Sequence, residues 1–418
     1  MTEQEKEERR IQLIQNKKNR KERSEQEWQK KRQRIAFTVM ILLVLAGLSH
    51  SFWDRSFHTF EEITSTPNSG ANYTQFIAYQ DGYLKYSQDG ISCLTQAEKV
   101  LWTEAYNMSN PAISVEGEYA AVADLEGNEV LLFDEGGKVG EYSMPYPVKK
   151  VQVASQGVFC VVLEEGTDNY IRLYNKEGSL LADIKSKLES NGYPLAVAIS
   201  SDGKKMVASY YCVDGIDSKN VLSFYNFGEG GKGQSGNLVG TYQFDHTFIP
   251  KIEFMDDRTV CAVGDDQTIF YQMKDKPKKV KTLSFNKEIK SVFSNHQYIG
   301  YIFENDSEGV EAGTEQPYQM MIYNKSGHLK ASIGRNKLYE SVKWGENVII
   351  SYTGSECSLL RMNGTEFFCQ NLGDNIVDVL PTAKRTEYMV IYSDRSTRIK
   401  LKNKIQLKTE KTEQEEES

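Results

Sequence analysis

Residues 111–144 read PAISVEGEYAAVADLEGNEVLLFDEGGKVGEYSM and contain four short apolar runs. The runs are PAISVE, YAAVADL, NEVLLFDE and GKVGEYSM, and each has the length of a β-strand. Gly, Asp, Asn and Glu occupy the breaks between the runs, as expected for tight turns. The stretch therefore predicts one four-stranded antiparallel unit.

This unit recurs along the chain. Periods of about 40–50 residues with four strands each are typical of propeller blades. We therefore predict an all-β fold, an eight-bladed β-propeller over residues 73–408, with seven blades as the alternative. The second, most apolar run can be aligned eight times, at 83–87, 119–125, 158–163, 205–211, 259–264, 298–303, 347–352 and 388–392.

A ring explains why these second runs are apolar at consecutive positions, as in VIISY at 348–352. One four-stranded sheet cannot bury both of its faces alone, whereas a sheet between two neighbours buries both. Period-2 alternation is not required in such a strand. The pattern therefore favours a closed ring of sheets over a single half-exposed sheet.

The motif Tyr-Asn-Lys-x-Gly occurs twice, at 174–178 and 323–327, an offset of 149 residues. The offset equals three units. The motif predicts the hairpin between the third and fourth strands of the third and sixth units, with Gly178 and Gly327 at positive φ after a type I turn. We interpret it as a turn that belongs to the fold, not as a binding motif.

Residues 35–53, IAFTVMILLVLAGLSHSFW, carry no charge. A helix of this length just crosses a ~30 Å hydrocarbon layer, and the basic cluster at 30–34 predicts a cytoplasmic amino terminus. We predict an uncleaved transmembrane signal-anchor, with the domain that follows outside the cytoplasm. A cleaved signal peptide and a buried soluble helix are the alternatives.

The remaining segments are assigned by composition. Residues 1–34 hold 12 Lys/Arg against 7 Asp/Glu and predict a cytoplasmic basic helical arm that contacts anionic lipid or a cytoplasmic partner. Residues 54–72 are expected to be a polar linker, and residues 409–418 a disordered acidic tail. Residues 35–407 hold 36 Lys/Arg against 46 Asp/Glu, an acidic balance that argues against nucleic-acid binding.

The repeats resemble those of the WD-repeat and quinoprotein propeller superfamilies. The segment CLTQAEKVLW at 93–102 is similar to the tryptophan-docking segment of quinoprotein repeats, although the Trp-Asp and Gly-His signatures of WD repeats are missing. The layout of residues 30–408 resembles an uncharacterised family of membrane-anchored propellers from Gram-positive bacteria. This resemblance implies a single-pass protein of the cell membrane with an extracytoplasmic propeller.

No catalytic constellation emerges, since HExxH, GxSxG and dinucleotide-binding fingerprints are absent from the sequence. We therefore assign no catalytic, cofactor-binding or metal residue and no cofactor. The glycine-rich segment 228–240 lacks the Ser or Thr of a phosphate-binding loop. Residues 304–315 approach the spacing of a calcium loop, but we interpret them as a solvated acidic loop and leave calcium binding open.

Cys357 and Cys369 flank the hairpin CSLLRMNGTEFFC. With a two-residue turn they point to opposite faces of the sheet, whereas with a three-residue loop at 362–364 they face each other and a disulfide is reachable. Both alternatives remain open. The cysteines at 160, 212 and 261 lie in apolar runs and are expected to be buried thiols.

We predict a non-enzymatic binding or scaffold module that holds a protein or cell-envelope partner at one rim of the propeller. The expected surface lies near the two longest insertions, 226–240 and 304–317, because loops tolerate insertions and carry function. The alternatives are an extracytoplasmic enzyme, quinoprotein-like or active on polysaccharide, and a sensor coupled to the cytoplasmic arm.

Overall fold

The computed structural model of the chain describes residues 28, 31, 34, 37–41, 55–68, 74–189, 191–214, 217–305, 316–345 and 347–403. The chain divides into two compact units, Met1–Ser56 and Phe57–Ser418. The predicted arm 1–34, span 35–53 and tail 409–418 lie largely or wholly outside the described residues. Among the residues that are described, no helix is both long and apolar enough to cross a membrane.

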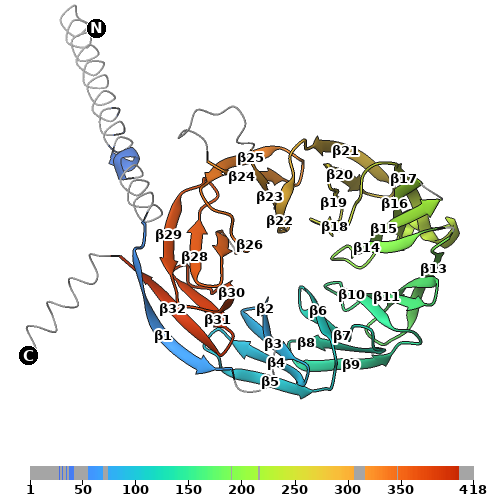
Figure 1. The fold of residues 1–418 in the computed structure, drawn as a ribbon, viewed down its shortest axis with the longest axis horizontal. Coiled ribbons are helices and arrows are strands. Elements are labelled where there is room, and N and C mark those ends of the chain that lie inside the picture. The colour runs from blue at the N-terminus through green and yellow to red at the C-terminus, as the bar shows by residue number, and fades with distance from the viewer. Residues whose placement is uncertain are drawn as a thin grey trace, which may run out of the picture. The chain divides into compact units, whose positions relative to one another are not determined.

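The second unit is a ring of eight four-stranded antiparallel sheets (Figure 1). Within each blade the first strand lies nearest the centre of the ring and the fourth lies outermost (Figure 1). The eight second runs found in the sequence form the second strands of the eight blades, so the eight-bladed prediction is confirmed and the seven-bladed alternative is wrong.

The first four blades have the following strands. Blade 1 comprises β2 (Gln75–Tyr79), β3 (Gly82–Ser87), β4 (Gly90–Thr95) and β5 (Val100–Ala105); blade 2, β6 (Pro111–Glu116), β7 (Tyr119–Asp124), β8 (Glu129–Asp134) and β9 (Gly137–Ser143); blade 3, β10 (Val148–Val153), β11 (Phe159–Glu165), β12 (Asp168–Tyr174) and β13 (Leu180–Lys187); blade 4, β14 (Tyr193–Ile199), β15 (Lys205–Asp214), β16 (Asp217–Asn226) and β17 (Leu238–Phe244). Two 3₁₀ turns, η1 (Glu229–Gly231) and η2 (Ser235–Asn237), lie between β16 and β17.

The other four blades complete the ring. Blade 5 comprises β18 (Lys251–Phe254), β19 (Thr259–Val263), β20 (Gln267–Met273) and β21 (Pro277–Ser284); blade 6, β22 (Ile289–Ser294), β23 (Tyr298–Glu304), β24 (Tyr318–Asn324) and β25 (Leu329–Arg335); blade 7, β26 (Ser341–Trp344), β27 (Ile349–Tyr352), β28 (Glu356–Leu360) and β29 (Glu366–Asn371); blade 8, β30 (Ile376–Pro381), β31 (Glu387–Tyr392), β32 (Arg395–Lys402) and β1 (Thr59–Pro67).

Strand β1 closes the ring by pairing with β32 as the outermost strand of blade 8. The register runs from Thr59 opposite Lys402 to Pro67 opposite Arg395. The prediction of a linker over 54–72 is therefore wrong. The segment TFEEITSTP has no apolar alternation because an outermost strand faces solvent, and seven of its nine residues are exposed.

The core of the ring is divided among the seams between blades. Eight clusters of buried apolar side chains occur, one at each seam. At the seam between blades 1 and 2, Trp102 of β5 stacks on Phe133 at 5.4 Å between ring centroids, and its indole N–H donates to the Glu135 carbonyl at 3.0 Å. Trp102 thus docks one blade on the next, as its resemblance to quinoprotein repeats implies.

The two Tyr-Asn-Lys-x-Gly motifs form the predicted hairpins, β12–β13 and β24–β25. Gly178 has φ of 80° and Gly327 has φ of 71°. A Cβ atom on Gly178 would lie 2.9 Å from the ring of Tyr142, which belongs to the outermost strand of the preceding blade. The motif therefore serves two purposes, because the glycine makes the turn and also lets the neighbouring blade approach.

The hairpin that joins Cys357 to Cys369 has a three-residue loop at 362–364. Arg361 N–H donates to the Thr365 carbonyl at 2.9 Å, and Gly364 has φ of 88°. This loop length was the condition under which the two cysteines were expected to face each other.

A β-bulge between the last two residues of β28 overturns that expectation. The bulge shifts the register by one residue, so that Cys357 faces Gln370 and Cys369 faces Ser358, and both thiols are free. All seven blades made of consecutive strands have a bulge between their third and fourth strands. The shift is therefore part of the blade itself, and the disulfide alternative is wrong.

Removal of β1 should open the ring. A chain that lacks residues 1–68 leaves the β32 edge unpaired, and we expect a lower midpoint and a broader transition in thermal unfolding than for a chain that lacks residues 1–56. Calorimetry of the two truncated chains measures the difference. Identical transitions would show that the eighth blade does not need its outer strand.

Substitution of two turn glycines by alanine separates two losses of unfolding free energy. One loss comes from a positive φ at a residue with a Cβ, and the other comes from contact between the new methyl group and a neighbouring side chain. Gly166, with φ of 61°, has no neighbour within 4 Å of a built Cβ, so Gly166→Ala should cost about 1 kcal/mol of unfolding free energy. Gly178→Ala should cost about 2 kcal/mol more, because the new methyl group meets Tyr142. Chemical denaturation of both variants tests this order, and equal losses would contradict it.

Candidate functional site

A cavity of about 830 Å³ lies against the inner strands of four consecutive blades, 6, 7, 8 and 1. Much of its wall comes from turns between first and second strands. The residues that line it are Phe76, Ile77, Ala78, Ser294, Asn295, His296, Gln297, Tyr298, Lys343, Trp344, Gly345, Asn347, Met362, Asp378, Leu380 and Pro381.

The turns that carry these side chains are fixed by their own hydrogen bonds. Asn295 follows β22, and its side-chain oxygen accepts from the backbone N–H of Gln297 at 2.9 Å and of Tyr298 at 2.7 Å. Asn favours such local turns. His296 is thereby presented on a turn that is fixed by two side-chain hydrogen bonds. In blade 7, Gly345 N–H donates to the Val348 carbonyl at 2.8 Å.

Aromatic rings and a methionine form the apolar side of the cavity. Trp344 lies 5.6 Å from Phe293 and 5.6 Å from Tyr298, measured between ring centroids. Met362, from the β28–β29 turn, packs against the same cluster. Tryptophan, tyrosine and methionine are enriched at protein interfaces: the two aromatic residues offer a large contact area at a low cost in conformational entropy, and methionine adapts its shape to the partner.

An ion pair between two blades forms the polar side. The Lys343 ammonium of β26 pairs with the Asp378 carboxylate of β30, and the Tyr352 hydroxyl donates to the same carboxylate oxygen at 2.8 Å. Burial lowers the pKa of Lys343, and the attraction to Asp378 opposes that shift only in part. The pair leaves this wall polar but without net charge.

A second ion pair lies on the neighbouring inner strand of blade 5. Lys251 pairs with Glu253 at 2.9 Å, and its ammonium also donates to the Ser294 hydroxyl at 3.3 Å. Within the described ranges, no group of three or more His, Cys, Asp or Glu side chains lies close enough to hold a metal ion. The contact with Lys251 fixes the hydroxyl of Ser294, which lines the cavity.

The glycine-rich segment 228–240 folds as a closed loop. Asn226 organises it, because its side-chain oxygen accepts from Gly228 N–H at 3.0 Å and its amide donates to the Asp275 carbonyl of the next blade at 3.0 Å. A Cβ on Gly231 would lie 1.6 Å from the Asn226 carbonyl oxygen. Gly231 therefore permits the loop to fold closely onto the end of its own strand, β16.

The two long insertions do not form one surface. Segment 226–240 joins the third and fourth strands of blade 4, whereas segment 304–317 joins the second and third strands of blade 6. In antiparallel blades those connections lie at opposite ends of the strands, so the two insertions belong to opposite faces of the ring. The predicted single rim near both is therefore wrong. Residues 306–315, with most of the calcium-like spacing, lie outside the described residues.

Sequence reasoning missed the cavity because its residues are distributed over four repeats. His296, Trp344 and Met362 each look ordinary in their own segments. The available signal was the blade register, since that register places all turns between first and second strands at one face. A search for side chains in those turns would have brought His296 and Asn347 together.

Comparison with known proteins identifies the sequence family. The family model described as "Family of unknown function (DUF5711)" matches residues 54–401. No curated protein matches the sequence.

Solved structures with a similar arrangement are propellers of low sequence identity. BamB from Moraxella catarrhalis is 12% identical with a TM-score of 0.49, and the match covers 82% of this chain and 100% of that one. Hydrazine synthase from Kuenenia stuttgartiensis is 14% identical with a TM-score of 0.42, covering 71% and 93%. The WD40 domain of Neurospora crassa Pan2 is 11% identical with a TM-score of 0.41, covering 71% and 89%.

The ion pair between blades can be tested by a double-mutant cycle. Lys343→Met leaves the Asp378 carboxylate without its cation, and Asp378→Leu leaves a partly buried ammonium, so each single variant should lose about 2 kcal/mol of unfolding free energy. The double variant should lose clearly less than the sum of the two single losses. Denaturant unfolding supplies all three values, and strict additivity would show that the pair is not coupled.

Proposed function

The chain belongs to this family of unknown function, and we propose that it is a non-enzymatic binding module that holds a segment of a protein partner in the cavity of blades 6, 7, 8 and 1. The observation that carries the proposal is the composition of that cavity. Trp344, Tyr298 and Met362 supply apolar side chains to the cavity lining, and the neutralised pair Lys343–Asp378 supplies polar ones.

Such a lining suits a peptide better than a free ion or a strongly charged ligand. An apolar side chain of the partner can enter between Trp344 and Met362, while its main-chain amides meet the polar turn at 294–297. Because the turns are held by their own hydrogen bonds, little conformational entropy is lost on binding. These features support recognition through a preformed surface.

We further propose that the module stands outside the cytoplasm on a single membrane anchor. The support is the uncharged stretch 35–53, preceded by the basic cluster at 30–34. The partner would then be another protein of the cell surface or the cell envelope.

Site-specific photocrosslinking in living cells tests the binding face. A photoreactive residue at Asn347, which is exposed beside the cavity, should form covalent adducts with one partner. The same residue at Asp266 is the control, because the β19–β20 turn lies on the opposite face and is also exposed.

A second substitution tests whether the adduct at Asn347 requires the apolar wall of the cavity. Met362→Glu should abolish the adduct at Asn347, since it places an unpaired charge on the apolar wall. Adducts of equal yield from both faces, or an adduct that survives Met362→Glu in folded protein, would rule the proposal out.

A further inference from the structure

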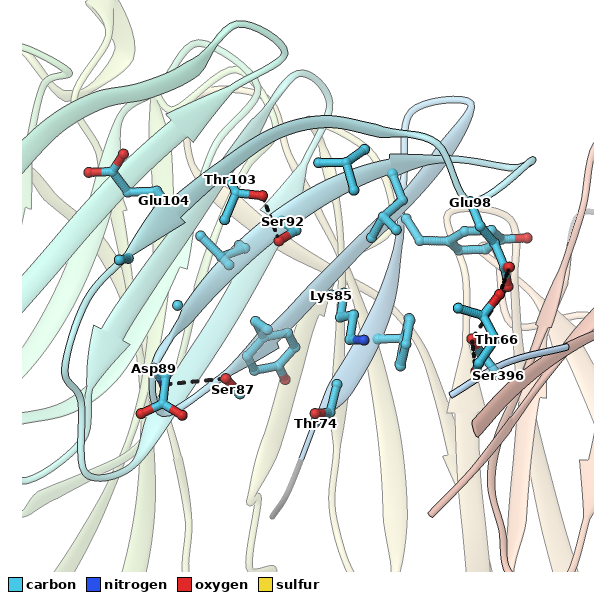
Figure 2. A pocket seen from close by; sticks show the side chains of 18 of the residues that line it. Thr66, Thr74, Lys85, Ser87, Asp89, Ser92, Glu98, Thr103, Glu104 and Ser396 are labelled. Carbon is cyan, nitrogen blue, oxygen red and sulfur yellow. Dashed lines mark hydrogen bonds between the residues drawn. The ribbon is translucent and has the colours of Figure 1, made fainter. Parts of the chain in front are cut away.

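A second cavity, of about 450 Å³, lies at the seam where the ring closes (Figure 2). One wall comes from β1, β31 and β32 of blade 8, and the other comes from β2 to β5 of blade 1. Figure 2 shows the Lys85 side chain among the lining residues, with Glu98 toward one end and Asp89 toward the other. This cavity shares Phe76 with the first one but is otherwise lined by different residues.

Counted over the described residues, the seam between blades 8 and 1 has the smallest core of the eight. Its cluster contains four buried side chains, Tyr83, Leu380, Met389 and Ile391, whereas each of the other seven clusters contains eight or more. Apolar surface that is buried against a neighbouring blade elsewhere therefore lines a cavity here.

Lys85 occupies a position that is part of the core in the other blades. On each second strand, alternate residues face the preceding blade, and in blade 1 these are Tyr83 and Lys85. Of these two, Lys85 is charged, and its side chain is partly exposed. The residues that face the preceding blade in the same way in blades 2 to 8 are all buried: Ala120 and Val122, Phe159 and Val161, Met206 and Ala208, Val260 and Ala262, Ile299 and Tyr301, Ile349 and Ser351, Tyr388 and Val390.

The Lys85 ammonium has no carboxylate within ion-pair distance among the described residues. It lies 5.6 Å from the centre of the Phe76 ring. Burial lowers the pKa of Lys85, and the field of Glu98 opposes that shift only in part. Among the described residues that line the cavity, Lys85 is the one cation.

Two of the three carboxylates around the cavity already have partners. Glu98 accepts hydrogen bonds from the Thr66 hydroxyl at 2.5 Å and from the Ser396 hydroxyl at 3.3 Å. Glu104 forms an ion pair with Lys138 at 2.5 Å. The third, Asp89, is exposed. None of the three forms an ion pair with the Lys85 ammonium among the described residues.

We propose that this cavity binds a small carboxylate with an aromatic or other apolar body, whose carboxylate pairs with Lys85 and whose body packs on Phe76 and Leu94, which lie on the same face of the sheet as Lys85. A charge-assisted bond to an ammonium is strong where water is partly excluded, and the apolar side chains supply the area for the body. The hydroxyls of Ser92 and Thr103, which are 3.0 Å apart, add polar groups on the blade 1 side. The site does not depend on the partner-binding cavity proposed above.

Fluorine NMR on the full-length chain in nonionic detergent tests the proposal with two probes of the same shape. Fluorobenzoate carries the carboxylate, and fluorobenzyl alcohol is its neutral counterpart. We expect Lys85→Met to weaken fluorobenzoate binding about tenfold and to leave fluorobenzyl alcohol binding unchanged. Methionine suits a core position, and thermal unfolding of the variant verifies that it folds.

Two further variants control for charge. Lys85→Arg should retain fluorobenzoate binding, and Lys187→Met, which removes an exposed lysine from blade 3, should have no effect. Fluorobenzoate that fails to bind the wild-type chain, or that binds Lys85→Met as tightly, overturns the proposal. Equal loss of both probes in Lys85→Met also overturns it, since the charge would then play no part in recognition.

Discussion

Closure of the ring is the constraint on which the rest of the structure depends. A four-stranded sheet buries its faces only between two neighbours, so the first and last blades must meet. The chain achieves this by pairing β1 with β32, which joins residues 59–67 to residues 395–402 by antiparallel hydrogen bonds. The ion pair of Glu61 with Lys402, at 2.9 Å, lies in this pairing. The spacing of blades at every other seam depends on this closure, because each blade packs between two neighbours.

Packing across the seams follows from the same requirement. Fourth strands dock on the turns of the next blade through Trp102 and Tyr142, and turn glycines such as Gly178 leave room for them. The seam at the closure differs from the rest. It joins segments from opposite ends of the chain, has the smallest core, and carries Lys85 where other blades have buried residues. A weakly packed seam thus supplies space for a ligand without disturbing the other seven.

Much of this fold could be predicted from the sequence because blade strands are local. The eight second runs, the Tyr-Asn-Lys-x-Gly hairpins and the three-residue loop at 362–364 each depend on neighbouring residues, and the structure confirms them. The prediction failed where a distant segment decided the outcome. Residues 59–67 look like a polar linker until they meet β32, and the bulge in β28 moves Cys357 away from Cys369 although the loop between them was foreseen.

The sequence by itself favoured eight blades and determined the identity of their second strands and the turn chemistry between strands, because these depend on short-range periodicity and on glycine at positive φ. Tertiary structure alone decided the two cavities. His296, Trp344 and Asp378 become neighbours only through the curvature of the ring, and Lys85 lines a cavity only because the eighth blade leaves its seam partly unfilled. Sites made between repeats cannot be read within any one repeat, since their distances are set by how the ring closes.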